Sequence, residues 1–271
     1  MPKPYILMPS ISIIIPTSGD SPHLEDCLSS IKKLDYNPKH IQTIVITNRD
    51  LKKTGRSFSF SRAVNLAATK ARGEYFLITN DDIVFAPASL KSLVKAKKRN
   101  PNTILGGKLF DKTTHEPAAA GYTMNLLLGI IRPVFTGNKP TPCDWVSACA
   151  LLLSQELWKK LQGFDERFAP GFFEDADLCL RAGTLGVKSL LIPEVELLHA
   201  QTATFNRDKS KKYEYWYRNK ILFLRKHASP IKLATNLLVQ YALFTPFRGL
   251  ILHDGRFLPA LKGLTWNLKH L

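Results

Sequence analysis

The chain has 271 residues, of which 45% are hydrophobic and 22% charged, a balance that excludes a disordered chain and indicates a folded globular protein. Its net charge is +16, and residues 205–271 carry 13 Lys/Arg against 3 Asp/Glu, or +10, which leaves +6 for the first 204 residues. A basic segment of this kind favours a polyanionic partner, such as nucleic acid or anionic lipid headgroups. Because no zinc-finger or RNA-binding sheet motif accompanies it, we expect no nucleic-acid partner.

The beginning of the chain carries no pattern of an export signal. Met1–Pro4 leads into the apolar run Ile11–Ile15, which is too short for a signal or a membrane span. The cysteines show no C-x-x-C or metal-finger spacing and are typical of reduced, mostly buried cytosolic thiols: Cys27, Cys143, Cys149 and Cys179. We therefore expect a cytoplasmic protein.

Strands and helices alternate over the first 110 residues. Short runs of apolar, β-forming residues predict strands at Ile11–Ile15, Ile41–Ile46 and Glu74–Thr79. We expect a first helix capped by Ser21 with Pro22 at its first position. Further helices are predicted over Ser61–Ala71, ended by Gly73, and over Pro87–Lys98. This alternation predicts an α/β fold with a doubly wound, mostly parallel sheet.

The middle of the chain is less regular. Residues 111–142 are rich in Gly, Pro and Thr and predict loops with short strands. Around them, apolar runs predict strands over Thr103–Phe110, Trp145–Leu153 and Val187–Ile192. Helices are expected over Gln155–Leu161 and Phe172–Leu185, and the last strand leads through Pro193–Leu198 to His199.

The composition changes after residue 204, where basic and apolar residues alternate in blocks. A basic helix is predicted over Lys209–His227, followed by the interrupted apolar stretches Ile231–Phe247 and Leu250–Leu271. Neither reaches the ~20 apolar residues of a membrane span. We favour amphipathic helices in a membrane interface, with basic side chains at the headgroups: Arg248, Arg256, Lys262 and Lys269. The alternative is a helical cap packed on the core.

Three groups of residues could carry chemistry. Asn80-Asp81-Asp82 follows a buried strand, where open α/β sheets bind ligands, and its oxygens suit a hard divalent cation, although Asn and Asp are also common turn residues. Glu174, Asp175 and Asp177 open a helix, either as caps or with a general base among them. His199 follows a strand and is either structural or a ligand of Mg²⁺ or Mn²⁺ together with Asp82.

The order of motifs resembles the inverting family 2 glycosyltransferases with a GT-A fold, particularly rhamnosyltransferase-like and galactofuranosyltransferase-like members. The matching pieces span about residues 10–230: Ser12–Thr17, Arg62–Asn65, Tyr75–Asp82, Trp145–Cys149, Gly163–Glu166, Phe173–Arg181, His199 and Tyr215–Lys220. The resemblance implies transfer of a sugar from a nucleoside-diphosphate donor to a glycan or polyprenyl-linked acceptor, in cell-surface polysaccharide synthesis at the inner face of the cell membrane.

The resemblance also implies roles for individual residues. Asp82, Asn80 and His199 would bind a Mg²⁺ or Mn²⁺ ion that bridges the donor diphosphate, and Asp175 would be the catalytic base. Residues placed at the acceptor are Glu174, Trp145 and Asp177. Residues placed at the donor are Thr17, Thr47, Arg62, Asn65 and Asp81. Many members carry Asp where this chain has Thr47, so the nucleotide stays open.

The expected organisation is a catalytic GT-A domain over residues 1–204 and a basic, membrane-associating helical region over 205–271. Within the first, 1–110 would bind the nucleotide sugar and 111–204 the acceptor. Two other functions are compatible with this sheet. One is a non-catalytic scaffold that binds anionic lipid or glycan. The other is a nucleotidyltransferase, which the lack of a Gly-rich, Lys-bearing phosphate loop after Ile15 disfavours.

Overall fold

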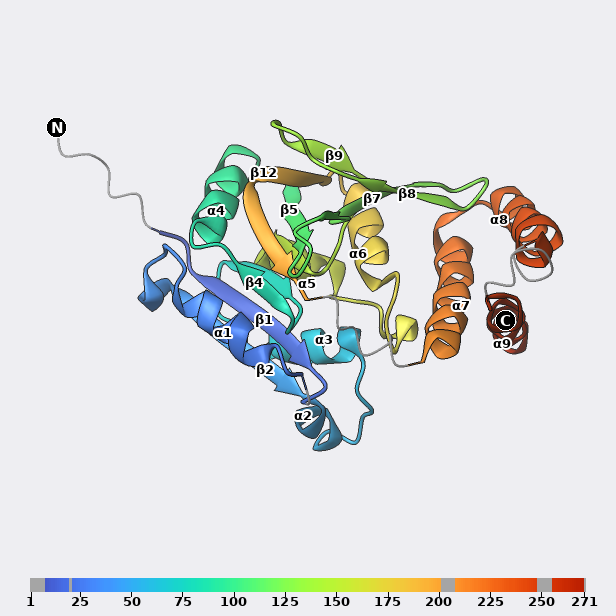
Figure 1. The fold of residues 1–271 in the computed structure, drawn as a ribbon, viewed down its shortest axis with the longest axis horizontal. Helices are drawn as coiled ribbons and strands as arrows, with labels where there is room; N and C mark the ends of the chain where they lie inside the picture. Colours follow the sequence, from blue (N-terminus) through green and yellow to red (C-terminus); the bar gives the residue numbers. More distant parts are fainter. Residues whose placement is uncertain (1–7, 20, 201–207, 248–254, 271) are drawn as a thin grey trace.

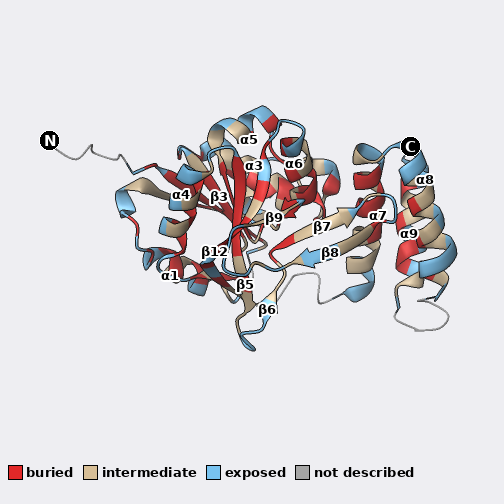
Figure 2. Ribbon diagram, turned by 90° about the horizontal axis from the view of Figure 1, so that it is seen from above, coloured by how far each residue is buried: buried red, intermediate tan, exposed pale blue. Residues whose placement is uncertain are grey.

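The computed structural model describes residues 8–19, 21–200, 208–247 and 255–270. A mixed β-sheet with helices on both faces makes up the body, and three further helices stand at one end of it (Figure 1). Viewed from above, α1 and α4 lie on one side of the sheet and α3, α5 and α6 on the other, and the strands between them are largely buried (Figure 2).

The main sheet has the strand order β2–β1–β3–β11–β5–β12–β4. These strands are β1 (Ile11–Thr17), β2 (Ile41–Thr47), β3 (Tyr75–Thr79), β4 (Ile83–Phe85), β5 (Thr103–Asp111), β11 (Ala150–Ser154) and β12 (Lys188–His199). β1 pairs in parallel with β2 and β3, and β12 with β5, whereas β11 runs antiparallel between β3 and β5 and β4 antiparallel to β12. Five strands therefore point the same way, and their carboxyl ends lie at one edge of the sheet.

A second, antiparallel sheet has the order β10–β7–β8. Its strands are β7 (Gly121–Asn125), β8 (Ile130–Val134) and β10 (Trp145–Val146), while β6 (Pro117–Ala118) and β9 (Thr141–Cys143) extend the main sheet along β5 and β12. The β7–β8 hairpin reaches towards α8 (Figure 1). At its turn, Gly129 has a φ of +65°, and a Cβ there would lie 1.8 Å from the Asn236 amide nitrogen. Only glycine fits this contact, which docks the hairpin on the terminal helices.

The helices of the body are α1 (Leu24–Lys32), α2 (Asn48–Lys52), α3 (Phe60–Lys70), α4 (Ser89–Arg99), α5 (Gln155–Leu161) and α6 (Glu174–Gly183), with short 3₁₀ turns at Pro38–His40 and Glu166–Phe168. The terminal helices are α7 (Lys209–His227), α8 (Pro230–Leu238), a π-helical segment (Val239–Phe244) and α9 (Phe257–Lys269).

The α/β prediction with a mostly parallel sheet and C-terminal helices is confirmed. β1 is buried along its whole length, as its continuous apolar sequence predicted for a strand covered on both faces. The helix predictions for Gln155–Leu161 and Lys209–His227 match α5 and α7 residue for residue. The thiol prediction is partly correct: all four cysteines are free, but only Cys27 and Cys179 are buried.

Three local predictions were wrong. α1 begins at Leu24, because the Ser21 hydroxyl accepts a hydrogen bond from His23 N in a turn before the helix rather than capping it. α3 ends at Lys70, and Gly73 instead lets β1 approach, since a Cβ on it would lie 2.3 Å from Ser12 N. The expected strand Trp145–Leu153 is two strands in different sheets, β10 and β11, separated by a loop.

The C-terminal segment both packs on the body and exposes apolar side chains. Tyr217, Phe223 and Leu224 of α7 are buried, as a helical cap requires. By contrast, Ile231, Leu238, Leu243, Phe247, Leu258 and Leu268 are 49–77% exposed. No helix in the described part of the chain is long and apolar enough to cross a membrane. Arg248 and the start of the predicted stretch Leu250–Leu271 lie outside the described residues.

We predict that Gly73→Ala destabilises the fold, because its Cβ would overlap backbone atoms of β1 that have no room to move. The expected loss is about 2–3 kcal/mol, which lowers Tm by several degrees in a thermal melt. Gly183→Ala is the control, since a Cβ at this position of α6 meets nothing within 4 Å. Equal melting temperatures for the two variants would contradict the packing argument.

Candidate active site

The carboxyl-terminal edge of the main sheet gathers the predicted residues of the donor side. Thr17 ends β1, Thr47 ends β2, the Asn80–Asp82 turn follows β3, and His199 ends β12. His199 pairs with Ile83 of β4, which fixes Asp82 beside it, and Asp82 O accepts a hydrogen bond of 3.0 Å from Ala200 N. Sheet topology alone therefore joins residues 117 positions apart in sequence (199 − 82).

Asp82 and His199 form a close pair at this edge. Asp82 Oδ2 lies 3.2 Å from His199 Nε2, and the carboxylate is 6% exposed. Its other oxygen, Oδ1, is buried and has no hydrogen-bond partner among the residues that the structure describes. Because a buried carboxylate oxygen without a donor is costly, a bound cation would stabilise it.

The donor set fits a hard divalent cation. Carboxylate oxygen, imidazole nitrogen and the amide of Asn80 are ligand types that Mg²⁺ or Mn²⁺ accepts, and phosphate oxygens commonly complete such shells. In the part of the chain that the structure describes, no group of three or more His, Cys, Asp or Glu side chains could hold a metal. A metal at Asp82 and His199 would therefore take further ligands from Asn80 and from a bound diphosphate.

A run of hydrogen bonds joins this turn to the second acidic group. Thr79 Oγ1 donates to Cys149 O at 2.7 Å, and Asn80 Nδ2 lies 3.4 Å from Cys149 Sγ. One residue earlier, Ala148 N donates to Asp175 Oδ2 at 3.1 Å. The loop Ser147–Cys149, which splits the expected strand, thus bridges the end of β3 and the first turn of α6.

Glu174 and Asp175 differ in their surroundings. Asp175 accepts from Ala148 N and, through Oδ1, from Ala176 N at 2.8 Å. Glu174 Oε2 is buried, and no partner for it lies in the described part of the chain. Burial, with the neighbouring Asp175, raises the pKa of Glu174 to about 8. Burial also raises the pKa of Asp175, but its two N–H donors favour the ionised form. Near neutral pH the pair is therefore suited to hold one proton, on Glu174.

The segment before α6 has a strained backbone. Phe172 and Phe173 both have positive φ, +76° and +71°, which costs of order 1 kcal/mol or more for each non-glycine residue. Asn219 of α7 holds it in place: its fully buried amide donates to Phe168 O and Gly171 O at 2.7 Å and to Phe172 O at 3.2 Å. The sequence prediction missed Asn219, although the family-like segment Tyr215–Lys220 contains it.

Asp177 lies deeper in α6 than the other two acids. It is fully buried and bonds Arg181 Nε at 2.8 Å, Lys226 Nζ at 2.7 Å and His227 Nε2 at 2.8 Å. Burial alone would raise the pKa of Asp177, but these partners bring it below its usual range. The carboxylate therefore locks α6 to α7, and its expected contact with an acceptor stays a prediction.

The predicted donor residues are engaged within the protein. Thr47 caps α2: its side chain accepts from Asp50 N, and the Asp50 side chain accepts from Thr47 N. The Asn65 amide nitrogen donates to Phe164 O and Glu166 Oε1, and its oxygen accepts from Phe164 N, all at 2.9–3.0 Å. Arg62 Nη1 donates to Ser57 Oγ at 2.6 Å. Burial raises the pKa of Asp81, whereas hydrogen bonds from the hydroxyls of Thr17 and Ser21 lower it in part. Their roles towards a donor stay predictions.

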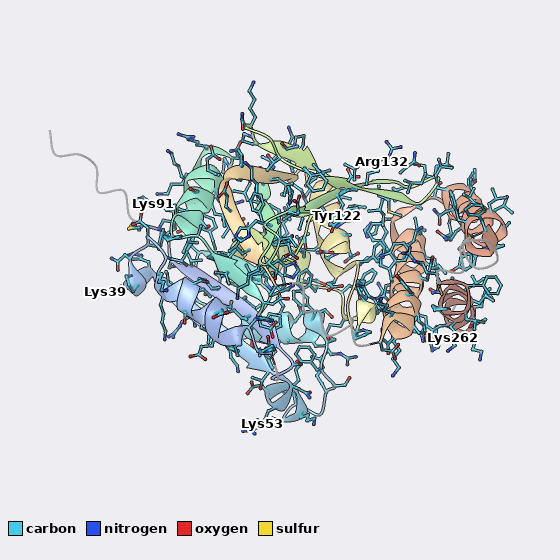
Figure 3. All side chains as sticks on the ribbon, viewed as in Figure 1. Lys39, Lys53, Lys91, Tyr122, Arg132 and Lys262 are labelled. Carbon is cyan, nitrogen blue, oxygen red and sulfur yellow. The ribbon has the colours of Figure 1, made fainter. Side chains whose placement is uncertain are left out.

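Trp145 forms an aromatic pair that the sequence prediction did not include. Its buried ring stacks on Tyr122 of β7, with centroids 5.3 Å apart and planes 21° from parallel. Tyr122 lies near the centre of the molecule (Figure 3). Burial raises the pKa of the Tyr122 phenol, with contributions from Cys149 and Asp175, so this ring belongs to the surroundings of the acidic pair.

Comparison with known proteins shows what the chain is similar to. Residues 47–144 match the Glycosyl transferase family 2 domain. The chain is 24% identical over 260 residues to an N-acetylglucosaminyl-diphospho-decaprenol L-rhamnosyltransferase of Mycobacterium tuberculosis, covering 79% of this chain and 83% of that one. It is 27% identical over 239 residues to the O-antigen biosynthesis protein RfbC of Myxococcus xanthus, covering 77% of this chain and 18% of RfbC.

Among solved structures, GalNAc-T7 with UDP, GalNAc and Mn²⁺ superposes with a TM-score of 0.68 at 12% identity, covering 98% of this chain and 58% of that one. The fold is therefore GT-A. The family match and the rhamnosyltransferase relatives support a glycosyltransferase enzyme. The resemblance to family 2 glycosyltransferases, and to rhamnosyltransferases among them, is confirmed.

We predict that Glu174→Gln removes a pH dependence of stability. The pKa of Glu174 is near its usual 4.5 in the unfolded chain but is raised to about 8 by burial in the folded protein. Between these pH values the folded state binds more protons, so it loses stability as pH rises. The variant should therefore unfold at a higher Tm than wild type at pH 8 and at nearly the same Tm at pH 4.5. An equal difference at both pH values would show that Glu174 is not the protonated partner.

Proposed function

We propose that the protein is a metal-dependent, inverting glycosyltransferase that moves a hexosyl or deoxyhexosyl group from a nucleoside-diphosphate donor to a glycan or lipid-linked acceptor in cell-surface polysaccharide synthesis. The observation that carries this proposal is the run of hydrogen bonds from Thr79 and Asn80 through Cys149 and Ala148 to Asp175. It sets a candidate diphosphate site and a candidate base on two sides of one three-residue loop.

On the acceptor side, Asp175 acts as the base. Its ionised carboxylate takes the proton of the acceptor hydroxyl while the hydroxyl oxygen bonds to the anomeric carbon. The bond from that carbon to the donor diphosphate breaks on the opposite face, which inverts the configuration. Protonated Glu174 can donate a hydrogen bond to the acceptor, and the Trp145–Tyr122 stack offers an apolar face to a sugar ring.

On the donor side, Asp82, His199 and Asn80 would hold a divalent cation at the place proposed for the diphosphate. Such a cation neutralises phosphate oxygens and stabilises the charge of the departing nucleoside diphosphate. The GalNAc-T7 structure contains UDP and Mn²⁺ and supports this assignment by fold. Thr17, Thr47, Arg62, Asn65 and Asp81 would line the nucleotide, whose base and sugar a screen of dTDP-, UDP- and GDP-sugars would identify.

The acceptor is proposed to be lipid-linked and the location the inner face of the cell membrane. The mycobacterial relative is named for a diphospho-decaprenol substrate. The exposed apolar side chains of α8 and α9 and the charge of +10 over residues 205–271 suit an anionic membrane surface. Lys262 projects from the outer side of α9 (Figure 3). The family match favours an enzyme over the alternative of a non-catalytic scaffold.

We predict that Asp175→Asn lowers the transfer rate by about 10²–10⁴-fold, because the amide cannot accept the hydroxyl proton. Donor binding should persist, since Asp175 does not belong to the proposed diphosphate site. The measurement is transfer from the donor found in the screen, with donor binding followed by calorimetry. Asp35→Asn, at a carboxylate that is 61% exposed, is the control. Full turnover by Asp175→Asn would remove this residue from the role of base.

We predict that Asp82→Asn and chelation weaken donor binding alike. Loss of the charge leaves His199 and Asn80 as neutral ligands, so Mn²⁺ should no longer raise the Tm in the presence of the nucleoside diphosphate. The readout is a thermal shift with and without Mn²⁺, beside transfer in excess EDTA. Asp208→Asn is the matched control, since Asp208 is the half-exposed N-cap residue of α7 and asparagine can cap a helix as well. Undiminished transfer in EDTA would exclude metal dependence.

A further inference from the structure

A second site is suggested by a cavity of about 530 Å³ outside the sheet edge. It lies between the β7–β8 turn, α7, the π-helical segment and the start of α9. Among the described residues that line it, three are cations, Lys212, Lys220 and Arg256, and none is an acid. Tyr213, Trp216 and Tyr217 provide aromatic walls.

Lys220 is the unusual member of this lining. Its side chain is 3% exposed, yet its Nζ donates only to the neutral Gln240 Oε1, at 2.9 Å, and lies 5.2 Å from the centre of the Trp216 ring. No ion pair with an acid is found for it within residues 8–19, 21–200, 208–247 and 255–270. A buried cation without a counter-ion is costly, and an anion in the cavity would supply the missing partner. Burial lowers the pKa of Lys220 to about 8.

The π-helical segment shapes the same cavity. Gln240 and Phe244, four residues apart within Val239–Phe244, both line it. π-Helical turns are uncommon and are frequently found at functional sites. Here the segment brings the partner of Lys220 and an aromatic side chain to one wall.

The mouth of the cavity is apolar and exposed. Leu128 at the hairpin turn and Phe244 line it and are 37% and 43% exposed. Leu127 and Leu243, next to them in sequence, are 42% and 63% exposed. A buried positive interior behind an apolar rim is complementary to a molecule with an anionic head and a hydrocarbon chain.

The cavity also adjoins the candidate base. The Trp216 ring, which lines the cavity, lies 5.7 Å from the ring of Phe173, the residue immediately before Glu174. One aromatic contact therefore connects the cavity to the first turn of α6. A sugar attached to an anionic head in the cavity would have to pass beside this aromatic contact to bring a hydroxyl to Asp175.

We propose that this cavity binds the diphosphate of the lipid-linked acceptor, with Lys220 at the phosphates and the first part of the hydrocarbon chain along Leu128 and Phe244. The proposal rests on the proposed function for the place of the sugar, but the binding of the lipid diphosphate can be measured without donor, metal or transfer.

The test is binding of farnesyl diphosphate in excess EDTA, followed by calorimetry. Lys220→Met should weaken binding about tenfold or more, because a charge-assisted hydrogen bond is lost. Leu128→Glu, at an exposed position that does not endanger folding, should weaken it similarly by setting a negative charge at the mouth. Leu185→Glu is the matched control, since Leu185 is 41% exposed and lies outside the cavity lining. Farnesol should bind far more weakly than the diphosphate.

Two outcomes would overturn the proposal. One is unchanged affinity in both Lys220→Met and Leu128→Glu. The other is displacement of farnesyl diphosphate by phosphatidylglycerol vesicles at equal phosphate concentration, which would make the cavity a site for membrane headgroups. Failure of the proposed function is separate: no transfer from any dTDP-, UDP- or GDP-sugar by the wild-type protein would sink that function, whereas loss of farnesyl diphosphate binding in Lys220→Met would still establish the cavity as a lipid-diphosphate site.

Discussion

The hydrogen bond from Ala148 N to Asp175 is the contact on which the arrangement of the site depends. The main sheet delivers Asp82 and His199 to its edge by strand direction alone, but α6 lies on a face of the sheet and needs a separate connection. The loop Ser147–Cys149 provides it, since one of its ends bonds Thr79 and Asn80 while its middle residue bonds the first turn of α6. Two acidic groups that would repel each other in contact are thus held near each other across a neutral backbone.

This connection also explains why the two carboxyls of α6 can differ. A carboxylate with two N–H donors remains ionised at lower pH than one with none. Asp175 accepts from Ala148 N and Ala176 N, whereas Oε2 of Glu174 has no hydrogen-bond partner among the described residues, so the local backbone favours the proton on Glu174. The same loop that orients the proposed base therefore also opposes the effect of burial, which raises the pKa of Asp175.

The sequence supported the prediction of features that depend on local pattern. Strand ends followed by Asn80–Asp82 and by His199 could be found because apolar runs and parallel topology determine where such residues lie. Asp175 could be assigned only through the family resemblance. The split of Trp145–Leu153 could not be foreseen, because Ser147–Cys149 leaves the strand to make bonds with residues far away in sequence. Asn219 and Tyr122 were missed for the same reason, since neither position has a local signal that marks its long-range partners.

The terminal helices are part of the site rather than an appendage to it. Successive residues of an α-helix point about 100° apart, so Asn219 and Lys220 face different neighbours from one place on α7. Asn219 holds the strained backbone before Glu174, and Lys220 lines the cavity with Gln240. A shift of α7 would change both together, because one rigid helix carries both side chains. The proposed lipid site and the proposed base therefore share one supporting helix, and α7 fixes the position of each relative to the other.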